Sequence, residues 1–308
     1  MNKGGSFDAA INICNELLSK GQTIVYMEGK SFPRKYVTAN GLGTLKDKEV
    51  MILTDQISAS ASEIIAGAIQ DNDRGLVIGR RTYGKGLVQD QIELSDGSAI
   101  RLTIARYFTP SGRNIQRKYE MGKTEEYNQE WLDRIIAGEG LYKDSVILNT
   151  NDSYYTLSGR KVYGGGGIMP DIFVPLDTTE LTSYFINLDS KGILNQFAYE
   201  YSDINRSKLK EFTNSEDMLQ FLKKQVSLYD IVRFAESKGI KRRTTLINIS
   251  ANRIINMTYA CILQNFFGEE VYFSMILKND PLVERAIDEI KKGNAVPKAV
   301  ANMKYLDD

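Results

Sequence analysis

The order of apolar and polar positions predicts an α/β fold for the first part of the chain. Residues 50–55 form a near-continuous apolar run, which is typical of a strand buried on both faces. Residues 60–71 follow with a helical period and several small side chains, so this helix can pack closely on a sheet. Residues 75–81 predict the next strand. Helix and buried strands thus alternate around one serine-rich turn.

The remaining elements of this part follow from the same patterns. A helical period over residues 6–20 predicts a helix that Ser6 or Asp8 would cap. Residues 30–48 are polar and rich in turn residues. Further strands are predicted at 22–29, 86–94, 98–109 and within 154–175. An Asp-Gly pair at 96–97 predicts a hairpin turn between two of them.

The pattern changes at about residue 180, after which helical periods dominate. Helices are predicted at 181–188, 192–201, 215–225, 227–239, 250–266 and 281–293. Only residues 244–250 read as a strand. We therefore predict a first domain over 1–176 and a helical domain over 177–308. An inserted excursion at 117–153 carries an amphipathic helix around Trp131, the only tryptophan.

The amino-acid composition limits the kinds of partner and catalytic residue that this chain can have. The chain has 39 Lys and Arg residues against 39 Asp and Glu residues, and no basic stripe indicates a nucleic-acid partner. No apolar run is long enough to span a bilayer. Cys14 and Cys261 lie in apolar helical contexts and are expected to be core residues. The count of histidines is zero, so a proton shuttle must be a carboxylate, a tyrosine or a lysine.

The candidate chemistry lies where the strand at 50–55 turns into the next helix. Ser58, Ser60 and Ser62 cluster there, and Lys85 stands between two glycines at the edge of a later strand. A serine hydroxyl needs an adjacent base, and a lysine can serve where burial disfavours its charged form. The hypothesis is a serine nucleophile with a lysine base. Periodicity does not decide which serine is the nucleophile.

The same turn could stabilise an oxyanion. If Ser60 starts the helix, the amide of Ala61 has no partner within the helix and can donate to a developing negative charge. A second donor could come from the Gly4–Gly5 turn. Two structural readings compete, because Ser60 with Glu63 forms a capping box and a single lysine is more often solvated.

Three other glycine or serine motifs fit their families poorly. Residues 79–86 resemble a phosphate loop but lack the hydroxyl at the last position and precede a strand. Residues 158–161 match the S-x-x-K of penicillin-recognising enzymes, yet they lie in a turn. The four glycines at 164–167 are not a dinucleotide fingerprint. They favour a loop where backbone segments approach closely.

Four motifs taken together resemble the carboxyl-terminal processing proteases, also called tail-specific proteases. The motifs are S-A-S-A-S-E-I-I-A-G-A-I-Q-D at 58–71, Y-G-K-G-L-V-Q at 83–89, T-P-S-G-R-N-I-Q at 109–116 and G-I-M-P-D-I at 167–172. The glycine-rich segment and the helical tail look like the version of Bacteroidetes-type bacteria. The resemblance implies a crotonase-like α/β core of ββα units, followed by a helical C-terminal domain.

The resemblance also implies roles for individual residues. Ser60 would be the nucleophile, Lys85 the general base and Gln89 the residue that orients the lysine. The oxyanion amides would be those of Gly5 and Ala61. The implied activity is endoproteolysis through an acyl-enzyme, with no metal or cofactor.

The family also suggests the setting of this activity. The substrates would be proteins with apolar C-terminal tails, bound as an added strand, and the location would be the cell envelope or periplasm. We expect no nucleic-acid partner, and a homo-oligomer is compatible with the family resemblance. Two alternatives stay open: a non-catalytic peptide-binding scaffold on the same core and, less favoured, an acyl-CoA enzyme.

The sequence departs from the family before its first motif. Family members have a strand with an aspartate-leucine-arginine signature ahead of the N-x-G-G turn, and also a PDZ domain. Here the chain opens on that turn, at Asn2. We expect it to begin inside a domain and, without the strand that holds Gly5, to be weakly active or inactive.

Overall fold

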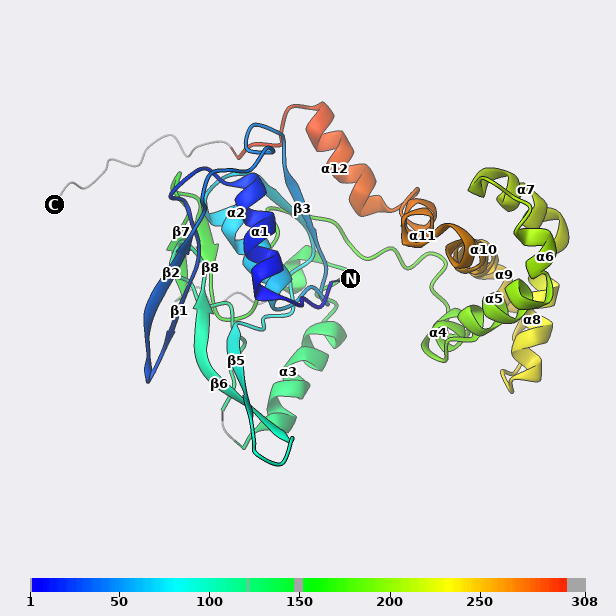
Figure 1. The fold of residues 1–308 in the computed structure, drawn as a ribbon, viewed down its shortest axis with the longest axis horizontal. Coiled ribbons are helices and arrows are strands. Elements are labelled where there is room, and N and C mark those ends of the chain that lie inside the picture. Colours follow the sequence, from blue (N-terminus) through cyan, green and yellow to red (C-terminus); the bar gives the residue numbers. More distant parts are fainter. Residues whose placement is uncertain (1, 121, 147–151, 298–308) are drawn as a thin grey trace. The chain divides into compact units, whose positions relative to one another are not determined.

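The structure, a computed structural model, describes residues 2–120, 122–146 and 152–297. Contacts divide the chain into two units (Figure 1). The first unit contains Met1–Leu176 together with Arg285–Asp308, and the second contains Asp177–Glu284. The functional division into domains at 1–176 and 177–308 stays a prediction.

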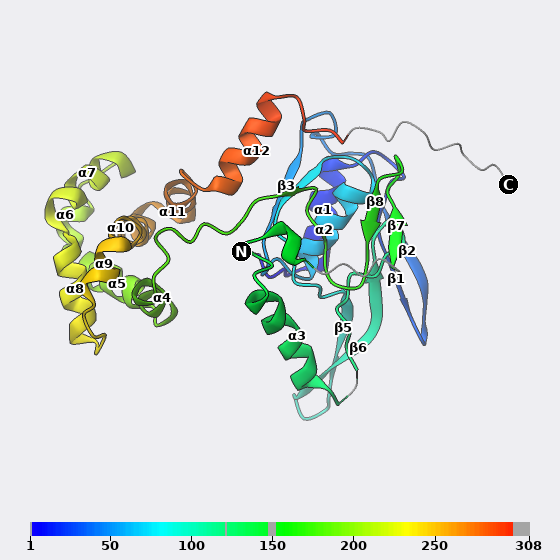
Figure 2. The same ribbon diagram turned by 180° about the vertical axis from the view of Figure 1, so that it is seen from behind.

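In the residues that the structure describes, the first unit is an α/β structure with three sheets. An antiparallel sheet has the order β2 (Phe32–Thr38), β1 (Thr23–Gly29), β6 (Ala99–Phe108) and β5 (Leu87–Glu93). A parallel sheet has the order β3 (Met51–Thr54), β4 (Leu76–Gly79) and β9 (Ile172–Phe173). The third sheet is the hairpin of β7 (Ser153–Tyr155) and β8 (Lys161–Tyr163). Figure 2 shows the antiparallel sheet and the hairpin of β7 and β8 from behind.

Two helices form the core of this unit with the sheets. α1 (Phe7–Leu17) and α2 (Ala61–Asp71) lie side by side (Figure 1). Cys14 of α1, Ile24 of β1 and Ile64 of α2 are at most 3% exposed and belong to one hydrophobic cluster. As predicted, Ser6 caps α1, because its hydroxyl accepts a hydrogen bond from the Ala9 amide.

In this unit the sequence reasoning missed one strand, and its expectation about the burial of another is wrong. Residues 30–48 contain β2, an edge strand that pairs only with β1 in the described residues and whose side chains are mostly exposed. The polar pattern therefore hid a strand rather than excluding one. β3 is also an edge strand, and Leu53 is 38% exposed, so it is not buried on both faces.

The excursion contains α3 (Thr124–Ile136), as the amphipathic pattern predicted, and a short 3₁₀ helix at Lys143–Ser145. Beyond it, residues 156–160 connect β7 and β8 with a turn at 156–159, which agrees with the turn expected there.

The second unit is helical, as predicted. Its helices are α4 (Ser183–Ser190), α5 (Ile193–Ile204), α6 (Arg206–Leu209), α7 (Ser215–Gln225), α8 (Leu228–Ser237), α9 (Thr244–Ile249), α10 (Ala251–Phe267) and α11 (Glu269–Ile276). A further helix, α12 (Pro281–Lys291), follows. Residues 244–250 were expected as a strand, and that expectation is wrong. Ile247 of α9 is buried in the helical core, so tertiary packing overrides the β-branched composition. Within the described residues, no helix is long and apolar enough to cross a membrane.

Candidate active site

Ser60 occupies a strained turn between β3 and α2. Its backbone has φ 61° and ψ −122°, a conformation that glycine adopts readily and L side chains rarely adopt. Strain of this kind persists only where the surroundings enforce it, and it often marks a functional residue. The side chain of Ser60 is partly exposed at the start of α2.

The hydroxyls of the two neighbouring serines hold this turn together. Ser58 is 6% exposed, and its hydroxyl accepts from the Asp55 amide and donates to the Asp55 carboxylate, each at 3.1 Å. The Ser62 hydroxyl contacts the carbonyl oxygens of Ala59 at 2.8 Å and Asn2 at 2.9 Å. Both hydroxyls are therefore engaged in structural hydrogen bonds.

The N-terminal glycine turn lies directly against Ser60. The carbonyl of Asn2 accepts a hydrogen bond from the Ala59 amide at 3.0 Å. A Cβ atom on Gly4 would stand 2.8 Å from the Ala61 nitrogen and 2.9 Å from Ser60 Cβ, so only glycine fits there. In the described part of the chain, no acceptor is recorded for the amides of Gly5 and Ala61. The two amides expected to hold an oxyanion are thus on segments that touch.

Glu63 connects the serine turn to the segment that carries Lys85. Its side chain is completely buried, and its Oε2 atom accepts from the amides of Ser60 and Lys85, each at 2.8 Å. Its Oε1 atom accepts from the Gly84 amide at 2.8 Å and contacts the Thr82 hydroxyl at 2.5 Å. Burial raises the pKa of Glu63, whereas these hydrogen bonds oppose the rise. Because both amides bind the same Oε2 atom, the backbones of Ser60 and Lys85 lie close together.

The backbone around Lys85 is fixed on its other neighbours too. The Gly86 amide donates to the side-chain oxygen of Gln116 at 2.9 Å. A Cβ atom on Gly84 would meet Arg117 Cγ at 2.6 Å and the Gly167 nitrogen at 3.0 Å. The four-glycine loop therefore passes close to this backbone, as expected from its sequence. Lys85 itself is partly buried.

Gln89 lies on β5, two residues after the strand begins. It pairs with Thr103 of β6 next to an irregularity in the register, and its side chain is exposed. Among the described residues, no hydrogen bond between Gln89 and Lys85 is recorded. The orienting role of Gln89 stays a prediction.

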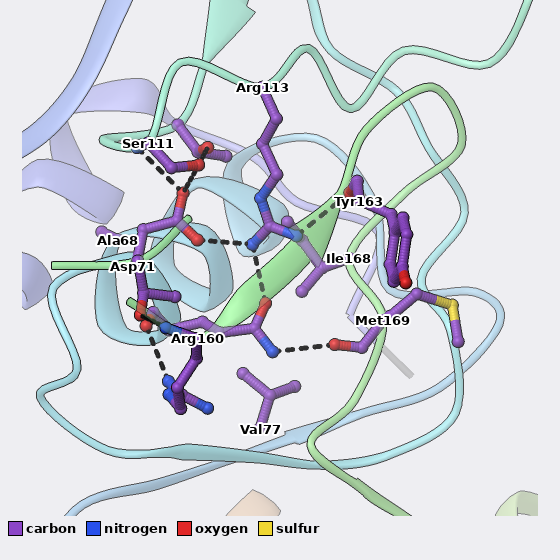
Figure 3. A network of polar contacts seen from close by, with 12 residues as sticks. Ala68, Asp71, Val77, Ser111, Arg113, Arg160, Tyr163, Ile168 and Met169 are labelled. Atoms are coloured by element: carbon purple, nitrogen blue, oxygen red, sulfur yellow. Dashed lines mark hydrogen bonds and ion pairs between the residues drawn. The ribbon is translucent and has the colours of Figure 1, made fainter. Parts of the chain in front are cut away.

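A buried polar network supports the end of α2 opposite the serine turn (Figure 3). The Arg113 Nη2 atom donates to the Asp71 carboxylate and to Gln70 Oε1, each at 2.7 Å, and the side chains of Arg113 and Asp71 are 0% exposed. Asp71 also accepts from the hydroxyl and the amide of Ser111. Gln70 donates to the carbonyl of Met169 at 2.9 Å. The network ties the motifs at 58–71, 109–116 and 167–172 together.

Sequence reasoning missed two residues that connect distant segments at the site. These residues are Glu63 and Arg113. Glu63 was recognised only as a local capping residue, and its capping bond to Ser60 is present. Its other partners are 19 to 22 residues away, so local spacing could not reveal them. The available signal was a glutamate in the first turn of a helix whose following residues, 64–69, are small or apolar, because a carboxylate among such residues needs partners.

The phosphate-loop match at 79–86 and the S-x-x-K match at 158–161 do not form the sites that these motifs form in their own families. The segment at 79–86 leads into β5 rather than into a helix, so the phosphate-loop geometry is absent from it. Arg160 of the S-x-x-K match pairs with Asp73 and Asp171 in a turn, and Lys161 is exposed. Within the residues described, no group of three or more His, Cys, Asp or Glu side chains could hold a metal ion.

Comparison with known proteins finds peptidases among the sequences similar to this chain. Residues 1–128 match the model of peptidase family S41, and residues 184–268 match a family of unknown function (DUF8443). The chain is 43% identical over 116 residues to a carboxyl-terminal-processing protease of Synechocystis, covering 38% of this chain and 27% of that protein. It is 39% identical over 218 residues to a probable CtpA-like serine protease of Staphylococcus haemolyticus, covering 70% and 38%.

The matches cover only part of these proteins. The chain spans 25% of the C-terminal processing peptidase of Tetradesmus obliquus, to which it is 39% identical over 116 residues, 38% of this chain. A solved photosystem II D1 C-terminal processing protease is 28% identical with a TM-score of 0.39, over 58% of this chain and 33% of that one. The similarity to peptidase family S41 thus lies in the N-terminal part of the chain, residues 1–128.

Proposed function

We propose that this chain is a serine endopeptidase in which Ser60 is the nucleophile and Lys85 the general base. The observation that carries the proposal is the shared contact to Glu63, which brings the backbones of Ser60 and Lys85 together. The engaged hydroxyls of Ser58 and Ser62 favour Ser60 among the three serines. The match to peptidase family S41 supports the reaction class.

The proposed reaction proceeds through an acyl-enzyme. Lys85 takes the Ser60 proton as Oγ attacks the scissile carbonyl carbon, and the amides of Gly5 and Ala61 donate to the oxyanion that forms. Lys85 then gives the proton to the leaving amine as the C–N bond breaks. Water attacks the ester with Lys85 as base, which releases the carboxylic acid and restores the serine hydroxyl. Gln89 is proposed to orient the lysine.

The proposed substrates are proteins cut near apolar C-terminal tails, and the proposed location is the cell envelope. Support comes from relatives that are described as carboxyl-terminal-processing proteases. A peptide library with a fixed scissile region and varied C-terminal residues tests the substrate class by mass spectrometry. Equal cleavage of apolar and charged tails would contradict the preference.

The experiment that tests the reaction compares Ser60→Ala, Ser62→Ala and Lys85→Ala with the unchanged protein. A fluorophosphonate probe should label the unchanged protein and Ser62→Ala, while Ser60→Ala stays unlabelled and Lys85→Ala reacts far more slowly. Labelling that persists in Ser60→Ala would refute the proposal. A non-catalytic scaffold, the alternative, would bind tail peptides equally with and without Lys85 and cleave none.

A further inference from the structure

A residue of the excursion donates hydrogen bonds to backbone carbonyls of the segment that leads to Lys85. Arg134 of α3 donates from Nη2 to the carbonyl oxygen of Thr82 at 3.1 Å and from Nη1 to that of Tyr83 at 3.3 Å. A guanidinium has five donors in a rigid planar arrangement, so one side chain can fix two successive carbonyls. Arg134 thus contacts the backbone two and three residues before Lys85.

Arg134 is itself held in place. Its Nε atom donates to Glu139 Oε2 at 2.6 Å, and the other oxygen of Glu139 accepts from Arg81 at 3.0 Å. The side chains of Arg134 and Glu139 are 11% and 8% exposed. A charge-assisted contact of this low exposure restricts the guanidinium to one orientation.

Aromatic packing adds a second connection between α3 and the same segment. The guanidinium of Arg117 lies 4.2 Å from the ring centre of Tyr83 and 4.0 Å from that of Tyr127. Arg117 is 1% exposed and pairs with Glu130 of α3 at 2.6 Å. The ring of Trp131 lies 6.1 Å from that of Tyr83. The side chain of Tyr83 is therefore packed against residues of the excursion.

The contacts of α3 and of Glu63 are complementary. Glu63 binds the amides of Gly84 and Lys85, and Arg134 binds the carbonyls of Thr82 and Tyr83. Segment 82–85 is thus held by hydrogen bonds from two directions. The match to the family model ends at residue 128, so Arg134 and Glu139 lie outside it.

We propose that α3 is a clamp that positions Lys85 and that Arg134 is its positioning residue. The inference rests on the proposed function for its catalytic meaning, because Arg134 acts through Lys85 and not on the substrate. Loss of the two carbonyl contacts lets segment 82–85 shift. A displacement of about 1 Å in a reacting group can lower a rate by on the order of 100-fold.

The test compares Arg134→Ala, Arg134→Lys and the matched control Gln129→Ala. Gln129 is an exposed residue of the same helix, and its recorded hydrogen bond goes to Asp133. We expect Arg134→Ala to lower kcat for a tail peptide by roughly 10- to 100-fold, with a much smaller change in KM. Arg134→Lys should retain part of the rate, and Gln129→Ala should match the unchanged protein.

Added guanidinium provides a readout that a purely structural role would not move. Arg134 lines an open cavity of about 670 Å³, so a small cation can enter where the side chain is removed. Guanidinium at concentrations below those that unfold the protein should restore part of the rate in Arg134→Ala only. A rate in Arg134→Ala equal to that of the unchanged protein, or a lost rate that guanidinium does not restore, would overturn the clamp.

Hydrogen exchange separates the clamp from the proposed reaction. In Arg134→Ala, the amides of Gly84 and Lys85 should exchange faster, by about 10-fold, while the amides of β1 keep their rates. If the unchanged protein neither cleaves peptides nor reacts with the probe, the proposed function fails and the exchange rates still decide the clamp. Unchanged exchange at both amides overturns it. Should Arg134→Ala fail to fold, Arg134→Lys is measured in the same way.

Discussion

The Oε2 atom of Glu63 lies 2.8 Å from the amide nitrogen of Lys85, which is 22 residues later in the chain. The same oxygen accepts the amide of Ser60 at the same distance. One buried carboxylate therefore connects the backbones of both residues proposed to carry the reaction. Removing this acceptor should affect folding and catalysis together.

Glu63→Gln is expected to weaken both the stability of the fold and the reactivity of Ser60. The amide group has one acceptor oxygen where the carboxylate has two, so at least one buried N–H group loses its partner. Such a loss costs about 1–3 kcal/mol in the free energy of unfolding, and probe labelling of Ser60 should slow by on the order of 100-fold. Urea denaturation and labelling rates measure the two effects. Glu126→Gln, at an exposed site on α3, should change neither; an unaffected labelling rate in Glu63→Gln would contradict the expectation.

The raised pKa of Glu63 gives stability a defined pH dependence. The folded pKa lies above the ordinary value of 4.5, so the native protein binds this proton more tightly than the unfolded chain does. The stability advantage of the unchanged protein over Glu63→Gln should therefore fall as the pH rises from about 4.5, and become constant above the folded pKa. Urea denaturation of both proteins between pH 4 and 8 measures this difference. A difference that grows with pH would show that the pKa is lowered instead.

The strained backbone at Ser60 predicts different stabilities for two substitutions that both remove the hydroxyl. Ser60→Gly should be about 1 kcal/mol more stable than Ser60→Ala, because glycine adopts φ 61° without steric cost. Neither variant should react with a fluorophosphonate. Thermal unfolding compares them. Equal stability would indicate that the turn relaxes when the side chain is shortened.

The buried pair of Arg113 and Asp71 should contribute strongly to the stability of the first unit. Arg113→Met leaves an uncompensated carboxylate whose exposure is 0%, and such a change costs about 3–5 kcal/mol. The exposed pair of Arg34 and Glu28 is the matched comparison, with side chains 49% and 41% exposed. Glu28→Gln should cost less than about 1 kcal/mol. Similar losses in the two variants, measured by urea denaturation, would contradict the argument.

The sequence predicted those elements whose side chains meet the core in a regular period. α2 carries Ile64, Ala68 and Ile69 on the buried side, and its pattern predicted its bounds within one residue. The hairpin of β5 and β6 was predicted from its Asp-Gly turn, even though most of its side chains are exposed. Local signals sufficed in both cases.

The elements that sequence reasoning missed depend on position in the sheet or on distant contacts. β2 has a polar sequence because an edge strand with exposed faces needs no apolar side chains. Residues 244–249 have a β-branched composition but form α9 because the surrounding helices bury Ile247. At the candidate site, the sequence motifs predicted the serine and the lysine. The contacts of Glu63 and Arg134 join residues far apart in the chain, so they could be found only in the folded structure.

The two cysteines make the units separately observable. The sequence contains only these two, with Cys14 in the hydrophobic cluster of α1, β1 and α2 and Cys261 in that of the helical unit. Burial raises the pKa of Cys14 to about 12 and that of Cys261 to about 11, so neither native thiol is a ready nucleophile. Each alkylation event must then wait for its own unit to open. Brief pulses of iodoacetamide, followed by peptide mapping, can therefore time the opening of either unit inside one intact molecule.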